Sequence, residues 1–175
     1  DGAAVGESSG TDIITNFENI EGGAGRDTLK GDAGSNILSG GGGDDTYIVT
    51  DGHDIIVTGT GADTLEVPAE YTVDQIELNS ENGNLVVSLT KANGTAHSLT
   101  VENHLENPLS ALRIYSYGQD DDGNQIEVAN DYGLLVDYDA DTNTYTARVD
   151  GLATRMDGTA EGETLVGMSG DDLIF

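Results

Sequence analysis

The chain of 175 residues has no cysteine and no tryptophan, only 2 prolines, and only 6 lysine and arginine residues. Without cysteine, disulfide bonds and thiol chemistry are excluded, and any redox compartment is allowed. No run of about 18 apolar residues occurs, so the sequence predicts no membrane insertion through a helix. With 25 glycines against 2 prolines, the composition favours turns over disorder.

The shortage of basic residues stands against 33 acidic ones, which gives a net charge of −27. Such a field repels nucleic acids and anionic membrane surfaces, so we expect neither as a partner. It also opposes compaction unless cations neutralise it. The charge balance therefore predicts a protein that depends on bound cations.

From Gly22 to Leu65 the chain repeats a nine-residue pattern, written in register as GGAGRDTLK, GDAGSNILS, GGGGDDTYI, VTDGHDIIV and TGTGADTLE. The fourth places are all glycine: Gly25, Gly34, Gly43, Gly52 and Gly61. The sixth places are acidic or amide residues: Asp27, Asn36, Asp45, Asp54 and Asp63. The eighth places are apolar or aromatic: Leu29, Leu38, Tyr47, Ile56 and Leu65. A constant period of this kind predicts a repeat architecture.

The spacing itself suggests a structure. Glycine permits positive φ, so the first six places form a turn, and the next three form a short β-strand with one inward side chain. Successive units then alternate between two sides of a flat coil, and units 18 residues apart stack. Asp27, Asp45 and Asp63 fall on one edge, and Asn36 and Asp54 on the other. Carboxylates stacked about 5 Å apart repel unless a cation lies between them, and oxygen ligands on flexible turns favour Ca²⁺.

The pattern resembles that of the RTX (repeats-in-toxin) nonapeptide family, G-G-x-G-x-D-x-apolar-x. The resemblance implies a parallel β-roll in which Ca²⁺ lies between stacked turns, held by backbone carbonyls and the sixth-place carboxylates. It implies one ion between Gly22, Ala24, Asp27 and Gly41, Gly43, Asp45. It implies a second between Gly40, Gly42, Asp45 and Gly59, Gly61, Asp63. A third would join Gly31, Ala33, Asn36 to Thr50, Gly52, Asp54, with Asn36 removing one charge.

After Pro68 the nine-residue period stops, and alternating segments predict an antiparallel β-rich region that resembles the segment following RTX repeats in secreted proteins. We expect strands at Thr72–Leu78, Leu85–Leu89, Ser98–Val101, Arg113–Tyr117, Gln125–Val128, Leu134–Tyr138 and Thr144–Val149, and a short helical turn at Pro108–Leu112. From Gly158 a repeat-like pattern returns, with Asp172 in a sixth place as a further candidate metal ligand. The predicted class is thus all-β, with a roll over residues 1–67, a companion over 68–155, and a second repeat stretch over 156–175. Alternatively, the two repeat stretches together form one split roll.

Three other signals were weighed. Asp120–Asn124 spaces its oxygens like the start of an EF-hand loop, but the strand pattern that follows favours an acidic hairpin tip. His53, His97 and His104 lack paired spacing for zinc, which favours structural roles. Six tyrosines of the companion would stack on sugar rings if they lined one exposed face, although ordinary strand packing is the commoner outcome.

Together these features predict a non-catalytic, secreted calcium-binding module that folds when calcium binds. The resemblance implies export by a type I exporter to the medium or the bacterial cell surface. The first context is a large surface adhesin, whose companion segment is structural or binds a surface glycan or other cell-surface ligand. The alternative is the C-terminal export and folding module of a secreted hydrolase, such as a lipase, a protease or a polysaccharide-modifying enzyme.

Overall fold

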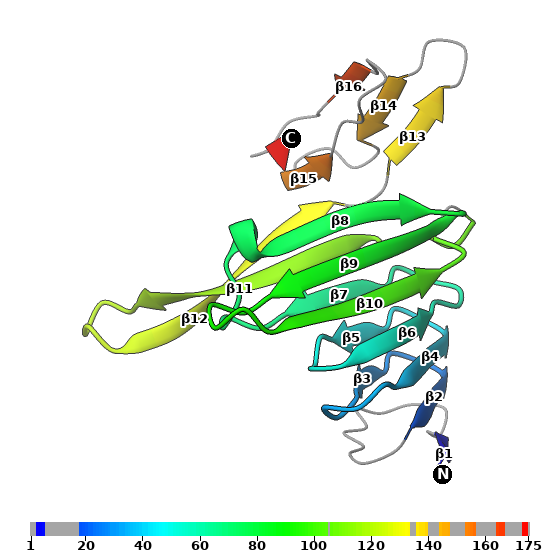
Figure 1. Ribbon diagram of the computed structural model, residues 1–175, viewed down its shortest axis with the longest axis horizontal. Coiled ribbons are helices and arrows are strands. Elements are labelled where there is room, and N and C mark those ends of the chain that lie inside the picture. The colour runs from blue at the N-terminus through cyan, green and yellow to red at the C-terminus, as the bar shows by residue number, and fades with distance from the viewer. Residues whose placement is uncertain are drawn as a thin grey trace.

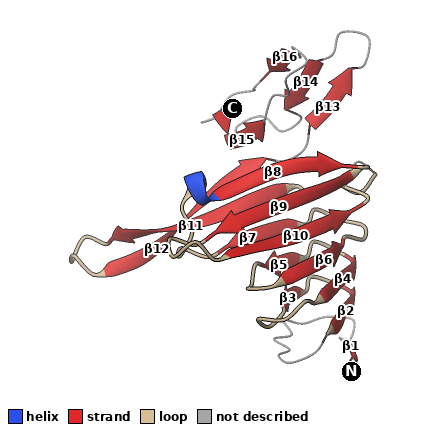
Figure 2. Cartoon of the chain, in the orientation of Figure 1, coloured by secondary structure: helices blue, strands red, loops and turns tan. Residues whose placement is uncertain are grey.

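The computed structural model describes residues 3–5, 18–104, 106–133, 136–139, 144–147, 153–156, 164–166 and 173–174. Within these ranges every regular element is a β-strand, apart from one short 3-10 helix at Val73–Gln75 (Figure 2). The all-β class predicted from the sequence is confirmed.

The repeat region forms a β-roll in which successive units contribute strands to two opposite sheets in turn. One sheet contains β2 (Asn19–Ala24), β4 (Ile37–Gly42) and β6 (His53–Val57). The other contains β3 (Thr28–Lys30), β5 (Thr46–Ile48) and β7 (Thr64–Val67). Neighbouring strands are parallel, with Leu38 opposite Ile56 and Leu29 opposite Tyr47. The predicted stacking of every second unit is confirmed.

The apolar eighth places give the roll its core. The side chains of Leu29, Leu38, Tyr47, Ile56 and Leu65 point between the two sheets, and none is more than 2 % exposed. Because each strand presents one inward residue and is flanked by a turn, a single coil buries little apolar surface. Stacking is what completes the core, as expected for a repeat protein.

Beyond Val67 both sheets of the roll continue without a break. In the first sheet β10 (Ala96–Glu102) pairs in parallel with β6, and β9 (Asn84–Thr90) and β8 (Ile76–Glu81) follow in antiparallel order. In the second sheet β11 (Ala111–Gln119) pairs in parallel with β7, and antiparallel β12 (Gln125–Gly133) follows. Figure 1 shows β8 to β10 covering one side of β7 and β11, while the end of the β11–β12 hairpin projects beyond them.

One hydrophobic cluster runs through both parts. It extends from Ile20 and Leu38 in the roll to Val87 and Leu99 in the first sheet, and to Ile114 in the second. The predicted division at residues 67 and 68 therefore separates two kinds of sequence, while the sheets and the core run across it.

The remaining strands are short and lie near the two ends of the chain. They are β1 (Ala3–Val5), β13 (Val136–Asp139), β14 (Thr144–Ala147), β15 (Ala153–Met156), β16 (Thr164–Val166) and β17 (Leu173–Ile174). β16 pairs with β14, whereas β17 pairs with β15, which in turn pairs with β12. In the order of the second sheet, β17 and β3 lie at opposite ends. Among the described pairings, the second repeat stretch contacts the companion strands and not the first roll.

Two local predictions were wrong. The expected helical turn at Pro108–Leu112 is absent, because Leu112 already lies in β11, where it pairs with Leu65 and is fully buried. The expected strand at Thr72–Leu78 begins with the 3-10 helix instead. The Thr72 carbonyl accepts a hydrogen bond from the Gln75 amide at 2.9 Å, and the Gln75 side chain accepts one from the Thr72 amide at 2.9 Å. In both places local hydrogen bonding or strand pairing overrides a weak sequence pattern.

Candidate metal centre

The turns of the roll stack so closely that side chains are excluded from their glycine positions. Gly41 and Gly43 have φ values of 92° and 116°, in the left-handed region that favours glycine. A Cβ atom at either residue would also collide with a carbonyl of the preceding stacked turn, that of Gly23 or Gly25. The glycines thus bring backbone carbonyls of successive turns into a narrow space.

The sixth-place residues form the predicted ladders. The Asp27 amide donates to Asp45 Oδ1 at 2.9 Å, and the Asp45 amide donates to Asp63 Oδ1 at 2.9 Å, each across 18 residues. On the opposite edge the Asn36 amide donates to Asp54 Oδ1 at 3.0 Å. All five side chains are buried.

On the first edge the ladder leaves carboxylate oxygens unsatisfied. Among the described residues, both oxygens of Asp27 and Oδ2 of Asp45 are buried without a hydrogen-bond partner. An ionised carboxylate buried without a partner is strongly unfavourable, and stacked carboxylates add repulsion to that cost. A divalent cation between the turns would bind the unpartnered oxygens and offset the repulsion between the carboxylates, so the residues present fit calcium.

The backbone groups predicted to complete these two sites lie beside the carboxylates. Gly23 pairs with Gly41 and Ala24 with Gly42, and Gly42 forms a bridge to Thr60 in the next turn. The two predicted sets of ligands (Gly22, Ala24, Asp27 with Gly41, Gly43, Asp45; Gly40, Gly42, Asp45 with Gly59, Gly61, Asp63) therefore belong to directly adjacent turns.

At these two sites, the carbonyls of Gly42 and Gly41 already accept backbone hydrogen bonds from neighbouring turns. The Gly42 carbonyl accepts one from Gly25 at 2.6 Å, and the Gly41 carbonyl accepts one from Thr60 at 3.0 Å. A carbonyl oxygen has two lone pairs, so each retains one for a metal ion. Within the described residues no three histidine, aspartate or glutamate side chains converge on one point. Most ligands of a calcium ion here would accordingly be backbone oxygens, which this hard cation accepts readily.

The third predicted site, on the opposite edge, differs in its carboxylate. Gly31, Ala33 and Asn36 lie in the turn stacked on that of Thr50, Gly52 and Asp54, as predicted. Here, however, both carboxylate oxygens of Asp54 have protein partners: the Asn36 amide at 3.0 Å and the Thr50 hydroxyl at 3.1 Å. These two oxygens therefore gain less from a calcium ion than those of Asp27, which lack partners among the described residues, and Asn36 supplies no second charge. We therefore expect weaker binding at this site than on the other edge.

The pKa values of the ladder carboxyls reflect their burial. Burial raises the pKa of Asp45 to about 6, opposed by the Asp27 amide and assisted by the neighbouring charges of Asp63 and Asp27. Burial also raises the pKa values of Asp63 and Asp54. Without a cation, these groups therefore bind protons more readily than free carboxylates do.

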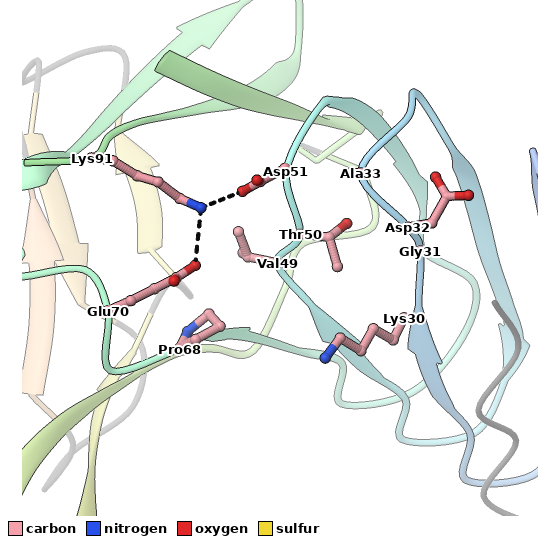
Figure 3. A pocket seen from close by; sticks show the side chains of 10 residues that line it. All are labelled: Lys30, Gly31, Asp32, Ala33, Val49, Thr50, Asp51, Pro68, Glu70 and Lys91. Carbon is pink, nitrogen blue, oxygen red and sulfur yellow. Dashed lines mark ion pairs between the residues drawn. The ribbon is translucent and has the colours of Figure 1, made fainter. Parts of the chain in front are cut away.

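The edge of the third site is closed by Lys91, which no sequence pattern indicated, and by His97, for which the sequence favoured a structural role. Lys91 Nζ lies 2.6 Å from Asp51 Oδ1 and 3.4 Å from Glu70 Oε1, at one side of a cavity of about 460 Å³ that Lys30 and Asp32 line on the other side (Figure 3). His97 is buried, and its Nδ1 accepts a hydrogen bond from the Gly52 amide at 3.1 Å. No local pattern predicts these contacts, because His97 lies in β10, 45 positions from Gly52, and Lys91 lies in the turn between β9 and β10.

Other singled-out residues have structural surroundings. Asp120 lies at the tip of the β11–β12 hairpin and accepts hydrogen bonds from the amides of Asp122 and Asn124 at 3.0 and 2.8 Å, so the acidic hairpin tip is confirmed. His53 bonds to the hydroxyl of Ser98 at 2.8 Å, and His104 accepts a hydrogen bond from the Leu109 amide at 3.3 Å. Asp172 lies outside the described residues.

A two-sheet roll with buried carboxylates between stacked glycine turns defines a calcium-binding repeat protein. A family model for the RTX calcium-binding nonapeptide repeat matches four copies, over residues 16–47, 48–66 and 157–175. The repeat stretches of this chain thus belong to the RTX family, and RTX nonapeptide repeats bind calcium.

The extracellular lipase LipA from Serratia marcescens is similar in structure over 89 % of this chain, with 21 % identity and a TM-score of 0.45. The chain spans 27 % of that lipase. No curated protein matches the chain in sequence. In the described part of the structure, no helix is long and apolar enough to cross a membrane.

Proposed function

We propose that this chain is an extracellular, non-catalytic calcium-binding module whose roll folds when calcium enters its turns. The observation that carries this proposal is the stack of Asp27, Asp45 and Asp63, in which buried carboxylate oxygens of Asp27 and Asp45 have no partner among the described residues. The net charge of −27 is a second penalty, because it also opposes compaction of the chain. Calcium removes both penalties.

The proposed mechanism follows from the affinity of such sites. Extracellular calcium modules bind at about 10⁻⁴ to 10⁻³ M, so the sites would be empty in the cytosol. The repelling carboxylates would then keep the chain unfolded during export through a type I exporter. At 100-fold saturation one site contributes only about 2.7 kcal/mol, so several sites must act together outside the cell.

Circular dichroism tests the proposal directly. The chain in excess chelator should lack the β-sheet spectrum, and millimolar Ca²⁺ should restore it, whereas the same concentration of Mg²⁺ should not. Magnesium is the matched control because it prefers octahedral geometry with retained waters. A chelated sample with the same spectrum and melting temperature as the calcium-loaded one would contradict the proposal.

For the parent protein, we favour a large type I-secreted adhesin over a secreted hydrolase. A specific observation supports a ligand-binding companion. Four of the six tyrosines noted above (Tyr71, Tyr115, Tyr117 and Tyr132) line one cleft of about 360 Å³, together with the polar Asn130 and Ser116. Aromatic rings beside amide and hydroxyl groups suit a glycan. Tyr117 is 59 % exposed, so its ring is open to stacking.

Glycan binding can be tested on the calcium-loaded chain with an array of surface saccharides. Tyr117→Ala should abolish any binding found, and Ile126→Ala, at another exposed apolar residue of the same hairpin, should leave it intact. Equal binding by both variants would remove the cleft from consideration. A catalytic domain encoded upstream of this chain would favour the hydrolase alternative.

A further inference from the structure

Tyr47 differs from every other eighth-place residue of the roll. The equivalent places hold leucine or isoleucine, whereas Tyr47 carries a hydroxyl into the core and is completely buried. A buried hydroxyl must find hydrogen-bond partners, or it destabilises the fold. Its partners are therefore informative.

The hydroxyl of Tyr47 lies between two calcium-binding turns. It donates a hydrogen bond to the Val57 carbonyl at 3.3 Å, and it interacts with the backbone amide of Gly40. A side chain at Gly40 would collide with both Tyr47 Oη and Asp45 Oδ2, so these two oxygens converge on the same point. Gly40 begins one turn of the second site, and Val57 immediately precedes the turn that contains Gly59.

Among the described residues, no core side chain links the two turns of the first site, which Arg26 and Asp44 join only at the exposed surface, at 3.1 Å. The residue stacked on Tyr47 from the preceding coil is Leu29, which has no polar atom in its side chain. On the far side the stacked residue is Leu65, with the same limitation. The two ladder sites that share Asp45 therefore have similar ligands, but within the part of the chain that the structure describes only the second has a side-chain hydrogen bond between its turns in the core.

We propose that Tyr47 is a positioning residue for the second calcium site, between the turn Gly40–Asp45 and the turn Gly59–Asp63, and that this site binds calcium more tightly than its neighbours. The inference rests on the proposed calcium function. The rigid ring fills the core, and its hydroxyl ties the start of one turn to the residue before the next. This link favours the folded arrangement in which the two turns stand at their binding separation, so calcium has to supply less of the cost of ordering them.

Calorimetric titration with Ca²⁺ on the whole chain tests the proposal. Tyr47→Phe keeps the ring and removes the hydroxyl, so the affinity of one site should fall about fivefold, the effect of one hydrogen bond. The other sites should keep their affinities. The matched control is Tyr115→Phe, which removes a hydroxyl that donates to Glu66 at 3.2 Å, away from the calcium turns; it should leave all sites unchanged. Unchanged titration of Tyr47→Phe, or equal weakening of all sites, would overturn the proposal.

A second measurement keeps Tyr47 in place and so does not depend on how well its variants fold. Tb³⁺ substitutes for Ca²⁺, and a nearby tyrosine ring sensitises its luminescence. The emission at low Tb³⁺ should be strongly reduced in Asp63→Asn, which impairs the second site, and preserved in Asp27→Asn, which impairs the first. The reverse order would overturn the proposal. If the unaltered chain bound no calcium, the proposed function itself would fail, and that outcome is distinct from the others.

Discussion

At the scale of single residues, the three aspartates of one ladder occupy different environments despite identical places in the repeat. Within the described structure, Asp27 has no partner for either carboxylate oxygen, and Asp45 has one for a single oxygen. Asp63 accepts hydrogen bonds from the amides of Asp45 and Gly59. The buried carboxylate oxygens without a partner therefore belong to Asp27, in the first site, and to Asp45, which both ladder sites share.

Because Asp45 belongs to both ladder sites, its loss should affect calcium binding more than the loss of Asn36. Asp45→Ala should remove about two sites in a calorimetric titration, and Asn36→Ala at most one. Asn36 serves a single site in which Asp54 already has two protein partners. Equal losses in the two variants would show that the ions do not lie between turns 18 residues apart.

His104 should make stability depend on pH. Burial lowers its pKa to about 4, from 6.5 in the unfolded chain. Between these values the unfolded state binds the proton and the folded state does not, so stability falls as the pH is lowered from about 6.5 to 4. In saturating calcium, the melting temperature of His104→Asn should depend less on pH in this range than that of the unaltered chain. The reason is that an amide oxygen can accept the hydrogen bond from the Leu109 amide without titrating. Identical pH profiles for the two proteins would exclude this role.

At the scale of elements, the main event is the joining of the roll to strands that do not follow the repeat. β10 takes the position beside β6 that a further coil would have occupied, and β11 does the same beside β7. These strands pair with the backbone edges of the roll, which would otherwise be open to association. Lys91, in the turn before β10, supplies a cation to Asp51, and His97, in β10, accepts a hydrogen bond from the Gly52 amide, so both residues contact the last turn on this edge of the roll.

Removing the Lys91 ammonium should weaken this junction. Lys91→Met retains the aliphatic stem but leaves Asp51 and Glu70 without their cation. Since the pair is partly exposed, we expect a loss of about 1 kcal/mol, a drop of roughly 2–4 °C in melting temperature. Lys30→Met is the matched control, because Lys30 lines the same cavity and forms no ion pair within the described residues. A larger effect for the control would contradict the assignment.

At the scale of the whole molecule, the single core predicts that the roll and the strands from β9 to β11 unfold together. Residues 22–65 and 84–119 share two sheets and one hydrophobic cluster. Removal of calcium should therefore abolish hydrogen-exchange protection in both ranges, even though the predicted ligands lie only in the first. Mass spectrometry of amide exchange with and without chelator measures this. Protection that persisted in 84–119 after chelation would show that these strands form an independent domain.

The sequence alone was sufficient for the roll, because a nine-residue period determines which residues turn, which point inward and which stack. The period places Asp27 and Asp45 on one edge, because units 18 residues apart stack on each other. The continuation past Val67 could not be assigned in this way. Ala96–Glu102 pairs with β6 through residues that lie 45 positions apart in the sequence. An alternating apolar pattern predicts that a segment is a strand, but it does not identify the strand with which that segment pairs. Tertiary structure also decided that Asp54 is satisfied by Thr50 and that Lys91 and His97 close its edge, because hydrogen-bond partners depend on positions that a repeat pattern does not encode.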